Sequence, residues 1–298
     1  MRLLKFAFSF IWLLTSALTW AQQTYTQEIG QFQRLKIDAN VNIVYKNLPD
    51  STGMARYVAP PGCDKLFILT LKGNGTLRVQ LGMTQWEDKI PPTLYLYSSF
   101  LNSVESSSDL TVIVENPAPC ATFNANQTGN GSIIVEDIKC TNLSASLTTG
   151  NGTVNISGSC TNANFRMVGT GTIYADRLQA ENVNCKILGT GSIGCWAIDN
   201  LTVKGLGTTK IYYKGHPNIK KTGGGKLFDL PESMVEDYDK SAVPVTSFDN
   251  PVVNENEVEE DAENDSPEDE ENLDEEEEED DDYDPDDENY QTVVTKDD

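Results

Sequence analysis

The residues that most resemble a chemical motif are the glycines of ILGTGSIG at 187–194. Gly189, Gly191 and Gly194 have the G-x-G-x-x-G spacing of a dinucleotide-binding loop. Such a loop needs a helix that begins directly after the glycines, so that backbone N–H groups and the helix dipole meet the phosphates. The residues after Gly191 are Ser-Ile-Gly-Cys-Trp-Ala-Ile-Asp-Asn, which indicate another short strand and a turn. The glycines are therefore expected to be structural turns, with no nucleotide cofactor.

Acidic residues and one histidine form a second set of candidates. Asp137, Asp176 and Asp199 fall in turns after strand-like runs and could line up along one edge of a repeated structure. A glycosidase needs two carboxylates about 5–9 Å apart, whereas aspartates in turns commonly bond to their own backbone. We expect turn residues here. His216, in YYKGHPN, is expected to be exposed in a turn, and no neighbouring carboxylate indicates a catalytic triad.

Cysteine spacing predicts a ladder. Cys120, Cys140 and Cys160 open equivalent segments 20 residues apart, and a strand spacing of about 4.8 Å lies inside the disulfide range. Parallel Cβ directions would angle the sulfurs poorly, so a bridge within the ladder and free thiols both stay open. Cys185 and Cys195 are expected to be small buried hydrophobic residues. A zinc site is not expected, because the chain has one histidine and no C-x-x-C pair.

The elements that would position these residues form a repeat. Each copy of the glycine motif ends in an apolar residue, and these residues recur every 21, 19, 20, 18 and 16 positions, a period of about 19. A run of alternating apolar and polar residues precedes each copy, which is typical of a strand with one buried face. The copies are GNGSI at 129–133, GNGTV at 150–154, GTGTI at 169–173, GTGSI at 189–193, GLGTTKI at 205–211 and GGGKL at 223–227.

A unit this short cannot bury its apolar face alone, so neighbouring copies must stack. Residues 22–230 are therefore predicted to form an all-β, right-handed parallel β-helix or β-solenoid, with glycine at its corners. Residues 25–115 are expected to follow the same style with a more regular sheet, GNGTL at 73–77 resembles a further corner, and Asp50 to Asp64 is expected to be a loop. Open solenoid ends need a cap or a partner, so a homo-oligomer is a further hypothesis.

The two ends differ from this body. Residues 1–21 have a basic start, a short apolar run and small residues near a cleavage point, which predicts a signal peptide, an exported protein and no transmembrane segment. Residues 231–298 are predicted to be a disordered acidic tail. Residues 249–298 hold 27 acidic residues against Lys296, so the tail accounts for the whole net charge of −24. Nucleic acid is not an expected partner, because no basic patch stands out in the sequence and the tail would repel phosphate.

The chain also resembles the head GIN domain family, the auto-transporter adhesin head of bacterial cell-envelope proteins. The resemblance covers about residues 25–230 and includes FQRLKI at 32–37, LKGNGTLRVQ, the serial GTGSI corners and IYYKGHPNIKKTGGG at 211–225. It implies a parallel-helix-like fold at the cell surface or in the periplasm and an adhesive role, and it brings no catalytic residues. Thr209, which replaces the second glycine of its corner, and the acidic tail depart from the pattern.

Three functional hypotheses follow. The first is a non-enzymatic cell-envelope module that presents a long Thr/Asn/Ser face to a surface ligand, a glycan or an envelope protein, without catalytic, metal-binding or cofactor-binding residues. The second is a carbohydrate-active β-helix enzyme of the polysaccharide lyase or glycosidase type, which rests on the aspartate edge alone. The third is a structural envelope protein whose acidic tail binds cations, which predicts calcium-dependent compaction of residues 249–298.

Overall fold

The computed structural model describes residues 22–82 and 90–230, so the signal peptide and the acidic tail expected at the two ends lie outside the described residues. Strands make up most of the described chain, with one short helix, η1 (Pro49–Ser51). The strands are β1 (Gln23–Glu28), β2 (Arg34–Ile37), β3 (Ile43–Lys46), β4 (Met54–Ala59), β5 (Phe67–Leu71), β6 (Thr76–Leu81), β7 (Leu94–Tyr97), β8 (Ser103–Ser106), β9 (Thr111–Glu115), β10 (Cys120–Thr128), β11 (Ser132–Thr148), β12 (Thr153–Gly169), β13 (Thr172–Gly189), β14 (Ser192–Leu206), β15 (Lys210–Lys214), β16 (Asn218–Gly223) and β17 (Lys226–Asp229).

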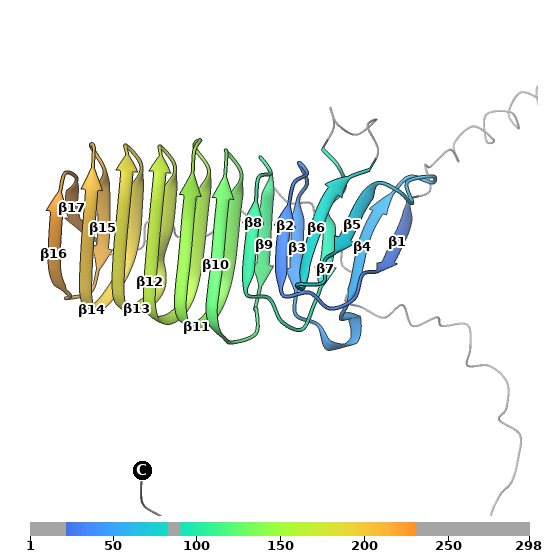
Figure 1. Cartoon of the computed structure of the whole chain (residues 1–298), viewed down its shortest axis with the longest axis horizontal. Helices are drawn as coiled ribbons and strands as arrows, with labels where there is room; N and C mark the ends of the chain where they lie inside the picture. The colour runs from blue at the N-terminus through green and yellow to red at the C-terminus, as the bar shows by residue number, and fades with distance from the viewer. Residues whose placement is uncertain (1–21, 83–89, 231–298) are drawn as a thin grey trace, which may run out of the picture. The chain divides into compact units, whose positions relative to one another are not determined.

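These strands coil into a β-solenoid with two walls, as the all-β prediction requires (Figure 1). The first wall contains β5, β6, β2, β8 and β10, then the second halves of β11 to β14, and finally β16. The second wall contains β1, β4, β7, β3 and β9, then the first halves of β11 to β14, and finally β15 and β17. Residues about 20 apart pair in parallel register, for example Cys140 with Cys160.

The recurring glycines form the sharp corners between β10 and β14, and two different requirements fix them. The first glycine of these turns has a positive φ, for example 132° at Gly169. Residues that carry a side chain rarely adopt such a backbone conformation. The second glycine is crowded by backbone, since a Cβ on Gly152 would lie 2.6 Å from the Gly129 oxygen of the preceding coil. At 189–194 the strand β14 starts at Ser192, where a nucleotide site would need a helix. The prediction of structural corners is confirmed.

The coils before β10 do not stack in sequence order. The coil of β2 and β3 lies between that of β6 and β7 and that of β8 and β9, because β2 pairs with both β6 and β8 and β3 pairs with both β7 and β9 (Figure 1). The chain therefore forms the β2–β3 coil before its neighbours. The β6–β7 coil then stacks on one side of it, and the β8–β9 coil stacks on the other side. Nothing in the alternation of a short strand encodes this order.

Two local predictions for this region were wrong. Asp50 to Asp64 is not a loop throughout, since β4 lies within it and buries Ala55, Tyr57 and Ala59 against the interior. Gly53 and Pro60 bound this strand, and their turn signals hid its alternation. GNGTL at 73–77 is a hairpin turn between the antiparallel β5 and β6, closed by a hydrogen bond from the Gly75 N–H to the Lys72 oxygen at 2.9 Å.

The interior is filled by columns of apolar side chains that run along the solenoid. In one column Phe165 pairs with Ala145 on one side and with Cys185 on the other. In the adjacent column of the same wall, Ala163 stands two residues before Phe165 and pairs with Leu143 and Val183. Large and small residues thus alternate between columns, so the narrow space between the walls is filled at a nearly constant volume per coil.

Candidate functional site

The outer face of the first wall carries three parallel columns of polar side chains. In the first column the amide of each asparagine donates to the preceding one: Asn162 to Asn142 at 3.0 Å, Asn182 to Asn162 at 3.2 Å and Asn200 to Asn182 at 2.8 Å. Asn218 continues the column beside Asn200. We call this set, Asn142, Asn162, Asn182, Asn200 and Asn218, the asparagine column. The Thr/Asn/Ser face predicted from the sequence exists on this wall.

The second column repeats the arrangement two residues further along each strand. Asn184 donates to Asn164 at 3.2 Å, with Asn124 and Ser144 before them and Thr202 after them in register. A side-chain amide offers two N–H donors and an oxygen with two lone pairs. A bond along the column uses one donor and one lone pair of each internal amide, so hydrogen-bonding capacity remains on a face where successive groups stand about 4.8 Å apart. The face is therefore a regular array of hydrogen-bond donors and acceptors.

The outer face of the second wall has a narrower polar column of hydroxyl groups. Thr153 donates to Ser132 at 2.8 Å, and the Thr172 and Ser192 hydroxyl oxygens lie 3.1 Å apart. A hydroxyl has one hydrogen-bond donor where a side-chain amide has two. The hydroxyl column of the second wall therefore offers fewer hydrogen-bond donors than the asparagine column. Substitutions in it can serve as controls for substitutions in the first wall.

The three aspartates do not form the line along one edge on which the enzyme hypothesis rested. Asp137 is exposed in a bend of β11, where its N–H donates to the Ser157 hydroxyl at 3.1 Å. Asp176, in β13, is only 2% exposed, whereas Asp199, in β14, is exposed to solvent. The coils have register shifts of different length at these bends, so equivalent sequence positions do not stack. This register therefore gives no support to the aspartate edge, the less favoured of the two interpretations.

The histidine and the cysteines lie where their spacing predicted. His216 is exposed between β15 and β16. Cys120, Cys140 and Cys160 pair in register as a ladder, and no disulfide joins any of the six cysteines in the structure. Burial and the neighbouring Cys140 raise the pKa of Cys120 to about 11, while a hydrogen bond with Cys160 raises the pKa of Cys140. Cys185 and Cys195 are buried and hydrogen-bonded to each other, which raises the pKa of Cys185. A bridge within the ladder stays a prediction.

Within residues 22–82 and 90–230, no three His, Cys, Asp or Glu side chains gather as metal ligands.

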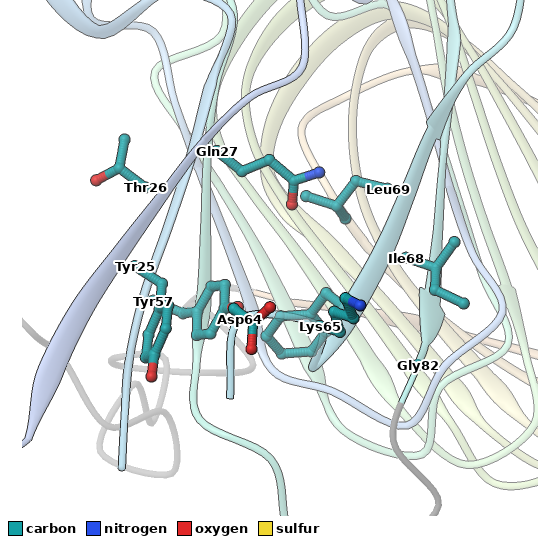
Figure 2. A pocket seen from close by; sticks show the side chains of 10 residues that line it. Tyr25, Thr26, Gln27, Tyr57, Asp64, Lys65, Ile68, Leu69 and Gly82 are labelled. Carbon is teal, nitrogen blue, oxygen red and sulfur yellow. The ribbon is translucent and has the colours of Figure 1, made fainter. Parts of the chain in front are cut away.

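A pocket of about 500 Å³ opens between the edge strands β1 and β5, at the end of the solenoid that these two strands form. Figure 2 shows Gln27 of β1 and Leu69 of β5 pointing toward one another across it, with Asp64 and Lys65 below. Its inner wall is aromatic, since Tyr25 stacks on Tyr57 with ring centroids 5.1 Å apart. In the described chain β1 pairs only with β4, and β5 pairs only with β6. Each wall of the solenoid therefore ends here in a strand with one unpaired edge. The homo-oligomer hypothesis stays a prediction.

The family follows from the matched span. The model of the family described as "Putative auto-transporter adhesin, head GIN domain" matches residues 68–217, half of the chain. The chain belongs to the head GIN domain family. The resemblance drawn from the glycine corners is thereby confirmed, and the family is described by adhesion and not by an enzymatic activity. No curated protein matches the sequence.

Solved structures of similar fold extend the comparison. A putative adhesin from Bacteroides fragilis is 22% identical, with a TM-score of 0.62 over 70% of this head GIN chain and 97% of its own. A putative adhesin from Parabacteroides merdae is 20% identical, with a TM-score of 0.57 over 70% and 96% of the two chains. A structure from Parabacteroides distasonis described as a putative lipid binding protein is 20% identical, with a TM-score of 0.53 over the same shares. At these identities the likeness concerns the fold.

The described part of this head GIN protein contains no helix with the length and hydrophobicity to cross a membrane.

Alkaline pH is expected to weaken the N-terminal end of the head GIN solenoid. Burial raises the pKa of Tyr57 from its ordinary value of 10.0 to about 12, and Tyr57 donates to the Cys63 oxygen at 2.7 Å. Burial also raises the pKa of Tyr45, which donates to the Ser98 oxygen at 2.6 Å. Between pH 10 and pH 12 the unfolded chain therefore holds fewer protons than the folded one, so the free energy of unfolding falls as pH rises through this window. Below pH 10 the stabilisation by Tyr57 is fully present and does not change with pH.

Urea unfolding at pH 8, 10 and 11.5 measures this slope. Tyr57→Phe removes one titrating group, so its unfolding free energy should fall less steeply above pH 10 than that of the wild type, whatever its value at pH 8. Equal slopes for the two proteins would contradict the assignment.

Proposed function

We propose that this head GIN protein is an exported, non-enzymatic binding module of the cell envelope, which recognises a surface glycan with the asparagine column and the second polar column of its first wall. The observation that carries the proposal is the asparagine column, in which neighbouring amides hydrogen-bond to each other and still have donors and lone pairs to offer. A ligand that repeats its hydroxyl groups can bind several such amides at once, and weak individual bonds then add to a useful affinity.

The exported location rests on the signal-like residues 1–21 and agrees with the adhesin description of the family. A rigid face also favours binding over catalysis. Side chains held by a continuous ladder lose little conformational entropy when a ligand arrives, whereas hydrolysis would need two acids at a set separation, which the separated aspartates do not supply.

A glycan-binding screen with the full chain tests the proposal. Asn162→Ala with Asn182→Ala removes the centre of the asparagine column, and we expect about tenfold weaker binding to any glycan that the wild type retains, at about 0.5–1.5 kcal/mol per lost hydrogen bond. Thr153→Val with Thr172→Val on the second wall is the matched control and should bind as the wild type does. Failure of the wild type to retain any glycan, or equal losses in both variants, would refute the proposal.

A further inference from the structure

The third polar column of the first wall changes its chemistry along the solenoid. It begins with Asn126 and Ser146, continues in register with Arg166, Lys186 and Lys204, and ends at Thr222. We call Arg166, Lys186 and Lys204 the basic column, and all three side chains are exposed. Neighbouring positive charges on adjacent strands, about 4.8 Å apart, repel each other. Within residues 22–82 and 90–230 none of the three has an ion-pair partner, so no carboxylate of these residues offsets the repulsion.

An apolar column lies directly beside the basic one. Val168, Leu188 and Leu206 follow the basic residues by two positions, point outward from the same strands and pair in register. Leu188 is 53% exposed and Leu206 is 66% exposed. These three residues replace the threonine of the preceding coil, Thr148, at the same position of the repeat. The change from polar to apolar therefore occurs in the same coils as the change from neutral to basic.

The two columns share a groove. A cavity of about 360 Å³ is lined by the basic column, the apolar column and the ends of β12, β13, β14 and β16. A bound anion there would relieve the repulsion among the three cations, which exposed solvent does only in part. An apolar chain in the groove would remove the exposed leucine surface from water at about 25 cal/mol per Å².

We propose that this groove binds an anionic lipid, with the headgroup on Arg166, Lys186 and Lys204 and an acyl chain along Val168, Leu188 and Leu206. The adjacency of charge and apolar surface favours an amphiphile. A soluble polyanion would neutralise the basic column but leave the leucines in water, and a neutral lipid would cover the leucines but leave the cations unpaired. The proposal goes beyond glycan recognition and does not depend on it, since it uses other residues and another ligand.

Vesicle sedimentation with the full chain tests this site. We expect the wild type to bind vesicles of phosphatidylcholine and phosphatidylglycerol in equal amounts and not vesicles of phosphatidylcholine alone. Arg166→Gln with Lys186→Gln and Lys204→Gln should weaken binding about 100-fold, because each basic residue at an anionic surface contributes about 1 kcal/mol. Leu188→Asn with Leu206→Asn should weaken it about tenfold. Arg34→Gln with Lys72→Gln and Lys139→Gln removes the same charge from exposed positions elsewhere and should leave binding unchanged.

Several results would overturn the proposal. It fails if the wild type does not bind anionic vesicles, binds neutral vesicles equally well, or loses as much binding in the control triple variant as in the basic-column variant. Displacement by inorganic phosphate or dextran sulfate, together with unchanged binding of the leucine variant, would reveal a plain anion site instead of a lipid site. The asparagine variants should bind vesicles normally, so a failure of glycan binding and a failure of lipid binding can be told apart.

Discussion

Gly171→Ala is expected to destabilise the solenoid by about 3 kcal/mol, toward the upper end of the cost of overpacking a core. Gly171 is the second glycine of its corner, and its φ is not in the left-handed region, so the expected loss comes from crowding alone. A Cβ at this position would overlap the carbonyl oxygen of Gly152 in the coil before it and the Leu147 side chain. The oxygen belongs to the stacked backbone, so it can move only if the two coils separate.

Thermal unfolding of the purified full chain measures this effect, and the expected loss corresponds to a lower midpoint by about 10 °C for a domain of this size. Gly73→Ala is the matched control, because Gly73 lies in the β5–β6 hairpin turn, has no positive φ and has no atom within 4 Å of a built Cβ. It should unfold as the wild type does, within about 0.5 kcal/mol. A Gly171→Ala protein as stable as the Gly73→Ala protein would mean that the coils are not in contact at this corner.

The second large effect is expected from Phe165→Ala, at about 3–5 kcal/mol. Phe165 is 2% exposed and lies between Ala145 and Cys185 in its column, so neither neighbour is large enough to fill the space that the ring would leave. The two walls could close on the cavity only by breaking register with the coils on either side. The cavity is therefore expected to persist, which puts the cost in the upper range for such substitutions.

Urea unfolding monitored by circular dichroism gives this free energy. Ile198→Ala serves as the reference, because Ile198 is 41% exposed and its truncation should cost less than about 1 kcal/mol. If Phe165→Ala also cost less than about 1 kcal/mol, the ring would not be the element that fills this coil.

Much of the solenoid could be predicted from the sequence because its strongest signals are local. The glycine corners repeat within each coil, and the alternation before Gly169 or Gly189 specifies which side chains face inward. The position of the cysteine ladder followed from the period alone. The insertion of the β2–β3 coil between later coils could not be predicted in this way, because pairing among short strands depends on contacts between residues far apart in the chain.

The register at the bends could not be predicted from the sequence. Asp137, Asp176 and Asp199 occupy similar positions in a written alignment, but bulges at the bends shift the true register, and a one-residue slip moves a side chain to the other face. The basic column was missed although its signal was present. Arg166, Lys186 and Lys204 each stand four residues after a member of the asparagine column, and stacking the repeats by those asparagines places them side by side.

The distance between two residues in the second polar column tests the stacked coils most directly. Asn124 and Thr202 stand four strand spacings apart in register. Nitroxide labels are attached at these two positions in an otherwise cysteine-free protein whose fold is verified by circular dichroism. Pulsed electron paramagnetic resonance should then give a narrow distribution of label distances near 20 Å, about four spacings. A distribution centred beyond about 35 Å, far from four spacings of about 4.8 Å, would show that the copies do not lie one on another and would contradict the continuous binding face.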